Sequence, residues 1–135
     1  MRGWKNEMKK IWWILILALI VIFTIFLLRG NEDSWIKDSR GVYIKHGSPS
    51  ETPSYVLDQQ RIINEALDMY NQEKTKGIVF NSQCLGKIGN VAVDIVHVPR
   101  TSEDDLAENQ CEAYKNGTVN HFIELDKDGN TVRIV

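Results

Sequence analysis

Two cysteines, Cys84 and Cys111, have the clearest chemistry in this chain of 135 residues. When oxidised they form a disulfide, whereas reduced Cys84 is a candidate nucleophile with His121 as the base that removes its proton. The charges around an apolar N-terminal segment place both cysteines outside a membrane, where cysteine pairs are usually oxidised. Closing the loop between them would stabilise a small domain by roughly 3–4 kcal/mol in the chain-entropy model. We therefore predict a Cys84–Cys111 disulfide, with a Cys84–His121 thiol site as the alternative.

Asp94 and His97 form a second group of candidates, in the apolar segment 91–98. Residues three apart on a strand point to opposite faces, so these two side chains do not form one local site. His97 shares its face with the apolar side chains of the segment, which predicts a hydrogen-bonded histidine in the core. Asp94 is a carboxylate within a buried strand, so we expect it to be strongly hydrogen-bonded or paired, for example with an arginine or lysine. No metal or cofactor is predicted for these residues, or for His46 and His121.

Three further polar motifs have structural interpretations. The acidic run 103–108 is predicted to be a solvated loop rather than a calcium patch. Residues 126–130 begin like a calcium-binding loop, but Thr131 stands where that loop needs glycine, which favours a hairpin turn. Asn116 heads an acceptor pattern for N-glycosylation that also suits a plain turn.

A long apolar segment precedes all of these residues. Residues 11–28 are apolar except for Thr24, and in a helix they would span roughly 27 Å, close to the hydrocarbon thickness of a bilayer. Trp12 and Trp13 suit the membrane interface. The segment is longer than the core of a cleaved signal and lacks a small-residue cleavage site. We therefore predict an uncleaved transmembrane helix that contacts the lipid bilayer.

The charges on either side of this segment predict its orientation. Bases outnumber acids before it, whereas the two are balanced after it. The positive-inside rule then predicts a cytoplasmic tail at 1–10, the single-pass helix at 11–28, a stalk at 29–40 and a domain outside the cell membrane at 41–135. Without residues 1–29 the chain keeps 11 bases and 17 acids, a net charge of −6. This acidic charge argues against binding to nucleic acids.

The outer residues have the patterns of one small α+β domain. Helical spacing from Val56 to Tyr70 predicts an amphipathic helix, with Thr52 as N-cap, Pro53 as first residue and Gly77 as stop. Strands are expected at 42–44, 78–80, 91–98, 119–125 and 131–135, with a turn at 86–90 and a polar loop or short helix at 100–118. The strand at 91–98 is apolar on both faces and should be central. Asp128-Gly129 predicts a hairpin. We expect the helix to pack on a mostly antiparallel sheet of four or five strands.

The cysteines also belong to a longer pattern. It runs QCLG at 83–86, VDIVHVPRT at 93–101, ENQC at 108–111 and HFIELD at 121–126. This pattern resembles small single-span membrane proteins predicted from prokaryotic genomes, whose function is uncharacterised, so it implies a membrane span and no activity. The architecture resembles that of type IV pilins, and Cys84 with His121 resembles the pair in transglutaminase-like thiol hydrolases.

These features predict a membrane-anchored binding or envelope-interaction module without catalytic activity, whose partner is an unknown protein or envelope component. No spacing brings together a nucleophile, a base and an oxyanion site. A pilin-like filament subunit and a Cys84–His121 thiol hydrolase remain as alternatives. Long loops on a rigid sheet are common binding surfaces, which points to loops 46–53 and 100–117. The alternative surface is the helix face formed by Ile62, Ala66 and Tyr70.

Overall fold

The computed structural model describes residues 2–29 and 33–135, and the side chains of residues 8–27 and 33–135. Met1, in the predicted tail, and residues 30–32, in the predicted stalk, lie outside the described residues. The chain divides into two compact units, Met1–Ser34 with Lys45–Ser50 and Trp35–Ile44 with Glu51–Val135.

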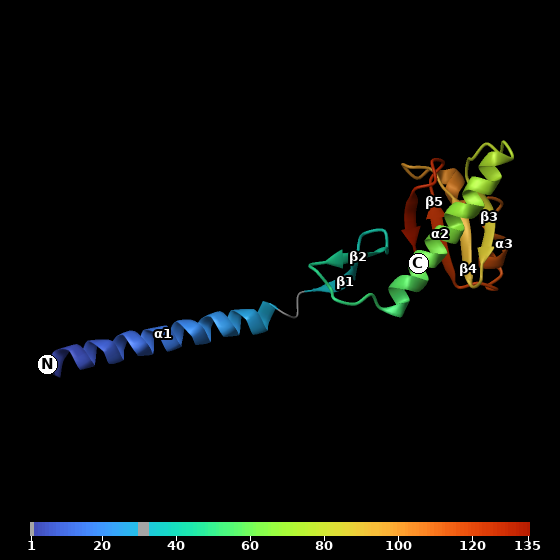
Figure 1. Ribbon diagram of the computed structural model, residues 1–135. Coiled ribbons are helices and arrows are strands. Elements are labelled where there is room, and N and C mark those ends of the chain that lie inside the picture. Colours follow the sequence, from blue (N-terminus) through green and yellow to red (C-terminus); the bar gives the residue numbers. More distant parts are fainter. Residues whose placement is uncertain (1, 30–32) are drawn as a thin grey trace. The chain divides into compact units, whose positions relative to one another are not determined.

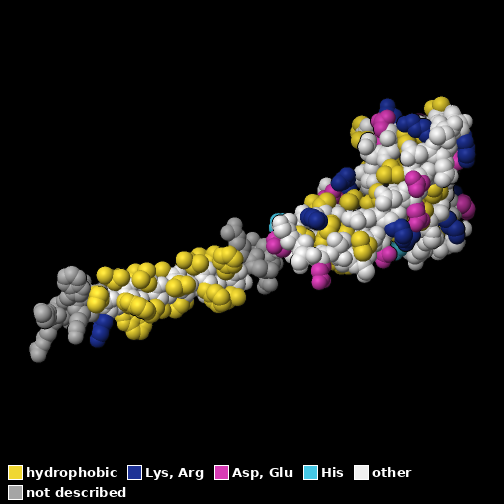
Figure 2. Space-filling view, viewed as in Figure 1, with side chains coloured by type: hydrophobic (Ala, Val, Ile, Leu, Met, Phe, Trp, Pro, Cys, Tyr) yellow, Lys and Arg dark blue, Asp and Glu magenta, His cyan; other side chains and the backbone are white. Residues whose placement is uncertain are grey.

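The first unit contains the helix α1, Arg2–Arg29. Its segment Met8–Leu27 is long and apolar enough to cross a membrane, with a mean hydropathy of 2.6 and no part buried within the described structure. Figure 2 shows hydrophobic side chains along this helix. The Thr24 hydroxyl donates a hydrogen bond to the carbonyl of Ile20 (2.8 Å), so this side chain is satisfied without water. This candidate span begins three residues before the predicted start at 11, and the added residues include Lys9 and Lys10.

Strands β1 (Ser34–Lys37) and β2 (Tyr43–His46) form a two-stranded sheet. Part of the predicted stalk is thus a strand, where the sequence analysis expects none. Gln59 of helix α2 (Ser54–Thr75) holds the residues that directly follow the predicted stalk. The Gln59 side chain accepts a hydrogen bond from the Tyr43 N–H (2.7 Å) and donates one to the Gly41 carbonyl (2.9 Å).

The second unit is an α+β domain with a four-stranded sheet, as predicted. Its elements are α2 (Ser54–Thr75), β3 (Gln83–Ile88), β4 (Val91–Ile95), the 3-10 helix η1 (Ser102–Asp105), α3 (Glu112–Lys115), β5 (His121–Leu125) and β6 (Thr131–Ile134). The strand order is β3-β4-β5-β6. Strands β3/β4 and β5/β6 pair antiparallel, whereas β4/β5 pair parallel. A parallel pair needs a crossover, and we name residues 96–120, which connect β4 to β5, the crossover segment.

Helix α2 covers one face of this sheet (Figure 1). Its buried residues Ala66 and Tyr70 pack against apolar side chains of β4 and β5, among them Val93 and Ile123, which are both fully buried. Gly77, with φ of +80°, ends the helix in the left-handed conformation that glycine adopts without strain. The start of the helix differs by one residue from the prediction, because Pro53 is the N-cap and Ser54 the first helical residue.

The crossover segment covers the second face of the sheet. Ala92 of β4 and Phe122 of β5 pack there against Cys111, Ala113 and Val119. Both faces of β4 are therefore buried, which confirms the predicted central position of this strand. The hydrogen bond from the Val96 N–H to the Leu125 carbonyl (2.9 Å) extends the β4/β5 pairing by one residue.

Two local predictions are wrong. Residues 78–80 form no strand; instead, Phe80 stacks on Tyr70 with ring centroids 4.5 Å apart. The predicted turn at 86–90 is shorter, because β3 continues to Ile88 and Gly86 lies at a β-bulge within it. The apolar residues 78–80 suggest a strand locally, but Phe80 packs against α2 instead. The hairpin at Asp128-Gly129 is confirmed, with φ of +87° at Gly129.

Candidate functional site

A cavity of about 250 Å³ lies on the second face of the sheet. Strands β4 and β5 form its floor and the crossover segment forms its walls. Its lining includes carboxylates, guanidinium groups and two aromatic rings, contributed by Asp94, Arg100, Tyr114, Phe122, Glu124 and Arg133. This combination of charged groups and an aromatic wall makes the cavity the candidate functional site of the domain.

Glu124 is the central charged residue of the cavity. Its side chain is 6 % exposed, and it accepts hydrogen bonds from Arg100 Nη1 (2.8 Å) and Arg133 Nε (3.0 Å). The hydrogen bonds of Arg100 to Glu124 and then to Asp105 raise the pKa of Arg100 above its usual value. Glu124 and Arg133 are direct partners across β5 and β6. The sequence analysis did not single out this pair, although counting outward from Asp128-Gly129 brings the two residues opposite each other.

Asp94 lies beside Glu124, because the two residues are register partners in the parallel pair β4/β5. Its carboxylate accepts a hydrogen bond from the Cys111 N–H (3.2 Å). Among the described residues no basic side chain forms an ion pair with Asp94, because both nearby arginines bind Glu124 instead. Of the two expected forms of compensation, the hydrogen bond is present and the ion pair is not. Burial, and then the negative charge of Glu124, raise the pKa of Asp94 to about 6, against the opposing effects of the Cys111 N–H and Arg100.

This raised pKa predicts a stability difference that depends on pH. The pKa of Asp94 in the folded protein, about 6, exceeds the value of about 3.9 for an unfolded chain. The neutral carboxyl therefore favours folding below about pH 4, and this contribution is lost as the pH rises through about 6. Asp94→Asn keeps an acceptor for the Cys111 N–H and cannot ionise. Between about pH 4 and about pH 7.5, the free energy of unfolding of Asp94→Asn should rise relative to that of wild type by about 1–2 kcal/mol. This value is smaller than the full pKa difference implies, because Asp94 is only partly buried and solvent screens its charge.

Urea titrations at both pH values measure this difference. Asp58→Asn, on the exposed side of α2, is the matched control and should show no such dependence. An Asp94→Asn effect of equal size at both pH values would contradict the assignment of the raised pKa to this carboxyl.

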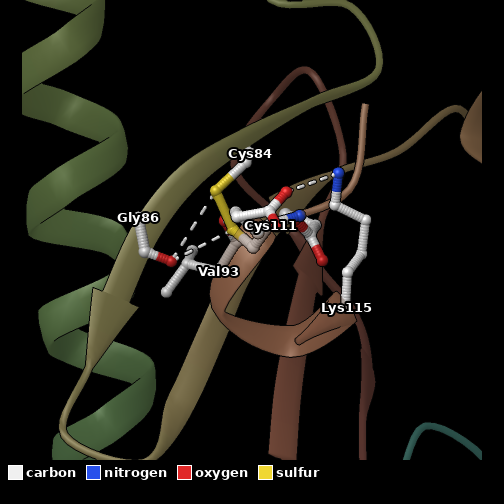
Figure 3. Close-up of a disulfide and its surroundings, with 7 residues drawn as sticks. Cys84, Gly86, Val93, Cys111 and Lys115 are labelled. Atoms are coloured by element: carbon white, nitrogen blue, oxygen red, sulfur yellow. Dashed lines mark hydrogen bonds and ion pairs between the residues drawn. A yellow bond between two sulfur atoms is a disulfide. The ribbon is translucent and has the colours of Figure 1, made fainter. Parts of the chain in front are cut away.

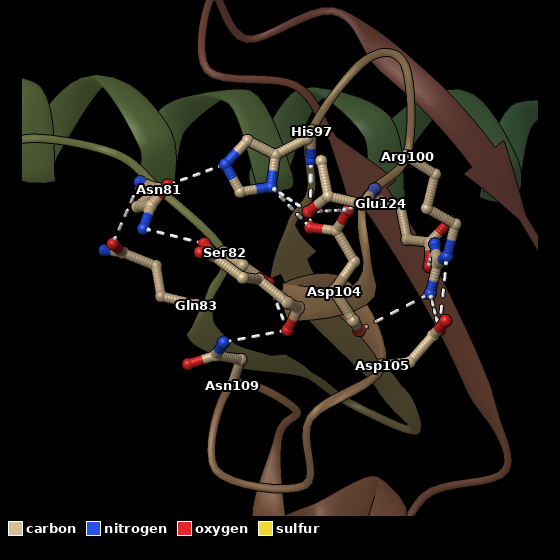
Figure 4. Close-up of polar contacts among 11 residues, drawn as sticks. Asn81, Ser82, Gln83, His97, Arg100, Asp104, Asp105, Asn109 and Glu124 are labelled. Carbon is tan, nitrogen blue, oxygen red and sulfur yellow. Dashed lines mark hydrogen bonds and ion pairs between the residues drawn. The ribbon is translucent and has the colours of Figure 1, made fainter.

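Most of the acidic run is solvated as predicted, with Glu103, Asp105 and Glu108 exposed, but Asp104 is buried. The Asp104 side chain is fully buried and accepts hydrogen bonds from the Thr101 N–H (2.7 Å) and from His97. Burial by itself would raise the pKa of Asp104, but the hydrogen bonds from Thr101 and His97 lower it to about 2. These contacts anchor the start of the crossover segment at one end of the cavity (Figure 4).

His97 belongs to this network and not to the core. Its side chain is 30 % exposed, with Nδ1 2.9 Å from Asp104 Oδ1 and Nε2 2.6 Å from Asn81 Oδ1. The predicted hydrogen bonding is present, but the predicted core position is wrong because β4 ends at Ile95. A second hollow, of about 470 Å³, borders His97 and the β5/β6 hairpin. Its acidic residue Asp126 is already used by the turn, where it accepts hydrogen bonds from Asn130.

The predicted disulfide between Cys84 and Cys111 is present (Figure 3). It joins β3 to the crossover segment at the edge of the cavity. Cys84, Asp94 and Cys111 place sulfur and oxygen atoms within 4.8 Å of one another, but the S–S bond leaves no thiolate to bind a metal ion.

The structure does not bring Cys84 and His121 together as a catalytic pair. Cys84 is the register partner of Asp94, whereas His121 pairs with Val91 at the opposite end of β4. The His121 ring has Nδ1 3.2 Å from the Val135 carbonyl. Asn116 is exposed in the turn after α3, and its side chain accepts a hydrogen bond from the Thr118 hydroxyl (2.6 Å). Its predicted glycosylation remains a prediction.

Comparisons with known proteins add no functional assignment. No family model matches the chain, and no curated protein or solved structure shows significant similarity to it.

Proposed function

We propose that this chain is a single-pass membrane protein whose α+β domain lies outside the cell and binds an extracytoplasmic protein or envelope component. The observation that carries the proposal is the cavity between the sheet and the crossover segment. The domain that contains this cavity belongs to a chain with an apolar N-terminal helix. The proposal assigns the domain a binding role.

The membrane topology rests on three features. The segment Met8–Leu27 satisfies the length and hydropathy of a membrane span. The bases Arg2, Lys5, Lys9 and Lys10 precede most of it, as expected for a cytoplasmic end. The Cys84–Cys111 disulfide fits an oxidising compartment on the other side. Together they support an N-terminus inside the cell and a domain outside.

The binding role rests on the charges in the cavity. The two arginines are neutralised by Glu124 and Asp105, whereas Asp94 has no basic partner among the described residues. Above about pH 6 the ionised Asp94 offers an acceptor for a ligand with hydrogen-bond donors or a positive charge. The helix face at Ala66 and Tyr70 is buried against the sheet, so the crossover segment is the better binding surface. Loop 46–53 is divided between the two units.

One experiment tests both parts of this proposal, with the full chain expressed in cells stripped of any outer wall. Added protease should remove the domain while leaving the membrane segment. In cells not treated with protease, a photo-crosslinking residue at Gln110, which lines the cavity, should capture a discrete partner. The same crosslinker at the exposed Asp58 on α2 is the control and should capture none.

Complete protection from the protease would contradict the topology. Capture from position 58 alone, or equally from both positions, would contradict binding at the cavity.

A further inference from the structure

The disulfide lies next to a carboxyl group that the binding proposal does not explain. The two sulfurs and a carboxylate oxygen of Asp94 lie within 4.8 Å of one another. The three residues come from β3, β4 and the crossover segment, so only the folded domain brings them together. At this distance, one intervening water molecule or a rotation of the released cysteine side chain would be enough for proton transfer.

The two sulfurs differ in their access to solvent. Cys84 is exposed at the edge strand β3, whereas Cys111 is 1 % exposed. An incoming thiolate must reach the sulfur that it attacks. Attack on the folded protein is therefore directed to Cys84 Sγ, and Cys111 Sγ becomes the leaving group.

The surroundings of Cys111 favour a neutral thiol over a thiolate. The carbonyl oxygens of Gly86 and Val93 lie 3.2 Å and 3.4 Å from Cys111 Sγ. In the disulfide these are sulfur–oxygen contacts, but a reduced Cys111 could donate its S–H to either oxygen. Carbonyl oxygens and burial both destabilise a thiolate at this position. A leaving Cys111 therefore needs a proton, and Asp94 is the neighbouring acid.

From this geometry we propose that the Cys84–Cys111 disulfide is redox-active: it oxidises a dithiol substrate through attack at Cys84, and Asp94 gives a proton to the departing Cys111. The substrate class is a dithiol with two accessible sulfhydryl groups. The proposal goes beyond ligand binding and does not rest on the proposed function, because it needs only the folded domain.

The exchange balances in two steps. A thiolate of the substrate attacks Cys84 Sγ; a substrate–Cys84 disulfide forms, the bond to Cys111 breaks, and Cys111 Sγ takes the proton of Asp94. The second substrate thiolate then attacks the sulfur bound to Cys84, which releases a substrate disulfide and a Cys84 thiolate. Cys84 and Asp94 are protonated from solvent. The substrate loses two electrons and two protons, and the two cysteines gain two of each.

The charged groups that act on Asp94 come from β5 and the crossover segment. Glu124 on β5 raises the pKa of Asp94 and Arg100 lowers it, in addition to burial and the Cys111 N–H. Lys87 on β3 is the register partner of Ala92, two residues before Asp94 on β4. On α3, Glu112 and Lys115 form an ion pair with each other. Because the pKa of Asp94 is about 6, Asp94 is an acid below this pH and a repelling charge above it.

The test measures reduction of the full chain by dithiothreitol in detergent, for wild type and Asp94→Asn, under conditions where the domain stays folded. The ratio of the two rates cancels the ionisation of dithiothreitol itself. The wild-type rate divided by the Asp94→Asn rate should fall about tenfold or more between about pH 5 and about pH 8, with a midpoint near pH 6. Wild type loses its proton donor over this range, whereas the variant has no proton to donate at any pH. Glu112→Gln, which removes an exposed carboxyl next to Cys111, is the matched control and should leave the rate ratio independent of pH.

A second measurement tests the site of attack. Cys111→Ser should form a mixed disulfide with oxidised glutathione at Cys84 quickly, and Cys84→Ser should react slowly at Cys111. A flat rate ratio for Asp94→Asn, faster reaction at Cys111, or reduction no faster than global unfolding would each overturn the proposal. Each of these results leaves the crosslinking at Gln110 unaffected.

Discussion

Replacing both Cys84 and Cys111 with serine should lower the free energy of unfolding of the α+β domain by about 3–4 kcal/mol. The disulfide joins residues 27 positions apart, and its loss releases the unfolded chain from a closed loop. It also removes the covalent attachment of the crossover segment to the sheet, next to the buried cluster of Ala92 and Val119. Circular dichroism during urea unfolding of the full chain in detergent measures the change.

Hydrogen exchange locates this effect within the domain. Amides of the crossover segment should lose protection before those of α2, because α2 packs on the opposite face of the sheet. Chemical reduction of the wild type should reproduce the loss seen in the double serine variant. A change below about 0.5 kcal/mol, the size of an ordinary surface substitution, would show that the disulfide does not support the domain.

Replacing Tyr70 with alanine should destabilise the domain by about 3–5 kcal/mol, which is typical for removal of a buried aromatic side chain. Tyr70 is 3 % exposed, stacks on Phe80 and donates a hydrogen bond to the Lys127 carbonyl (2.8 Å). A Cβ at Gly129 would come within 2.9 Å of the Tyr70 ring, so this ring fills the space under the β5/β6 hairpin. The same urea titration of the full chain measures the loss.

Two variants separate the contributions of Tyr70. Tyr70→Phe keeps the ring and removes the hydrogen bond to Lys127, which should cost about 1 kcal/mol. Tyr55→Ala is the matched control, because the Tyr55 side chain is 48 % exposed on the same helix, and its cost should stay below about 1 kcal/mol. Equal losses for Tyr70→Ala and Tyr55→Ala would contradict the placement of Tyr70 in the core.

Asp94 connects the cavity, the disulfide and the stability of the domain. Its carboxylate faces a cavity, accepts the Cys111 N–H and lies beside Glu124. An asparagine would satisfy the same backbone N–H without the cost of a charge at neutral pH. A side chain that lowers stability where a neutral analogue would raise it is characteristic of functional sites, and this cost supports a role for Asp94 beyond packing.

Elements with a short-range signal could be predicted from the sequence. The apolar run in α1 and the apolar spacing from Val56 to Tyr70 in α2 depend on residues within a few turns of each other. Gly77 ends α2 as predicted, and Asp128-Gly129 forms the expected turn. The cysteine pairing followed from the number of cysteines and the predicted compartment, and the structure contains it.

The sequence by itself therefore determined the apolar helix, the amphipathic helix and the hairpin, because each depends on neighbouring residues. It also determined the disulfide, because a chain with two cysteines allows only one intramolecular pairing. Only the tertiary structure decided the site. Asp94 and Glu124 are 30 positions apart in the sequence, and the parallel register of β4 and β5 makes them neighbours. Asp104 becomes buried because the crossover segment folds back on His97. Such pairings are set by how both faces of the sheet are packed, and no local pattern of residue types specifies them.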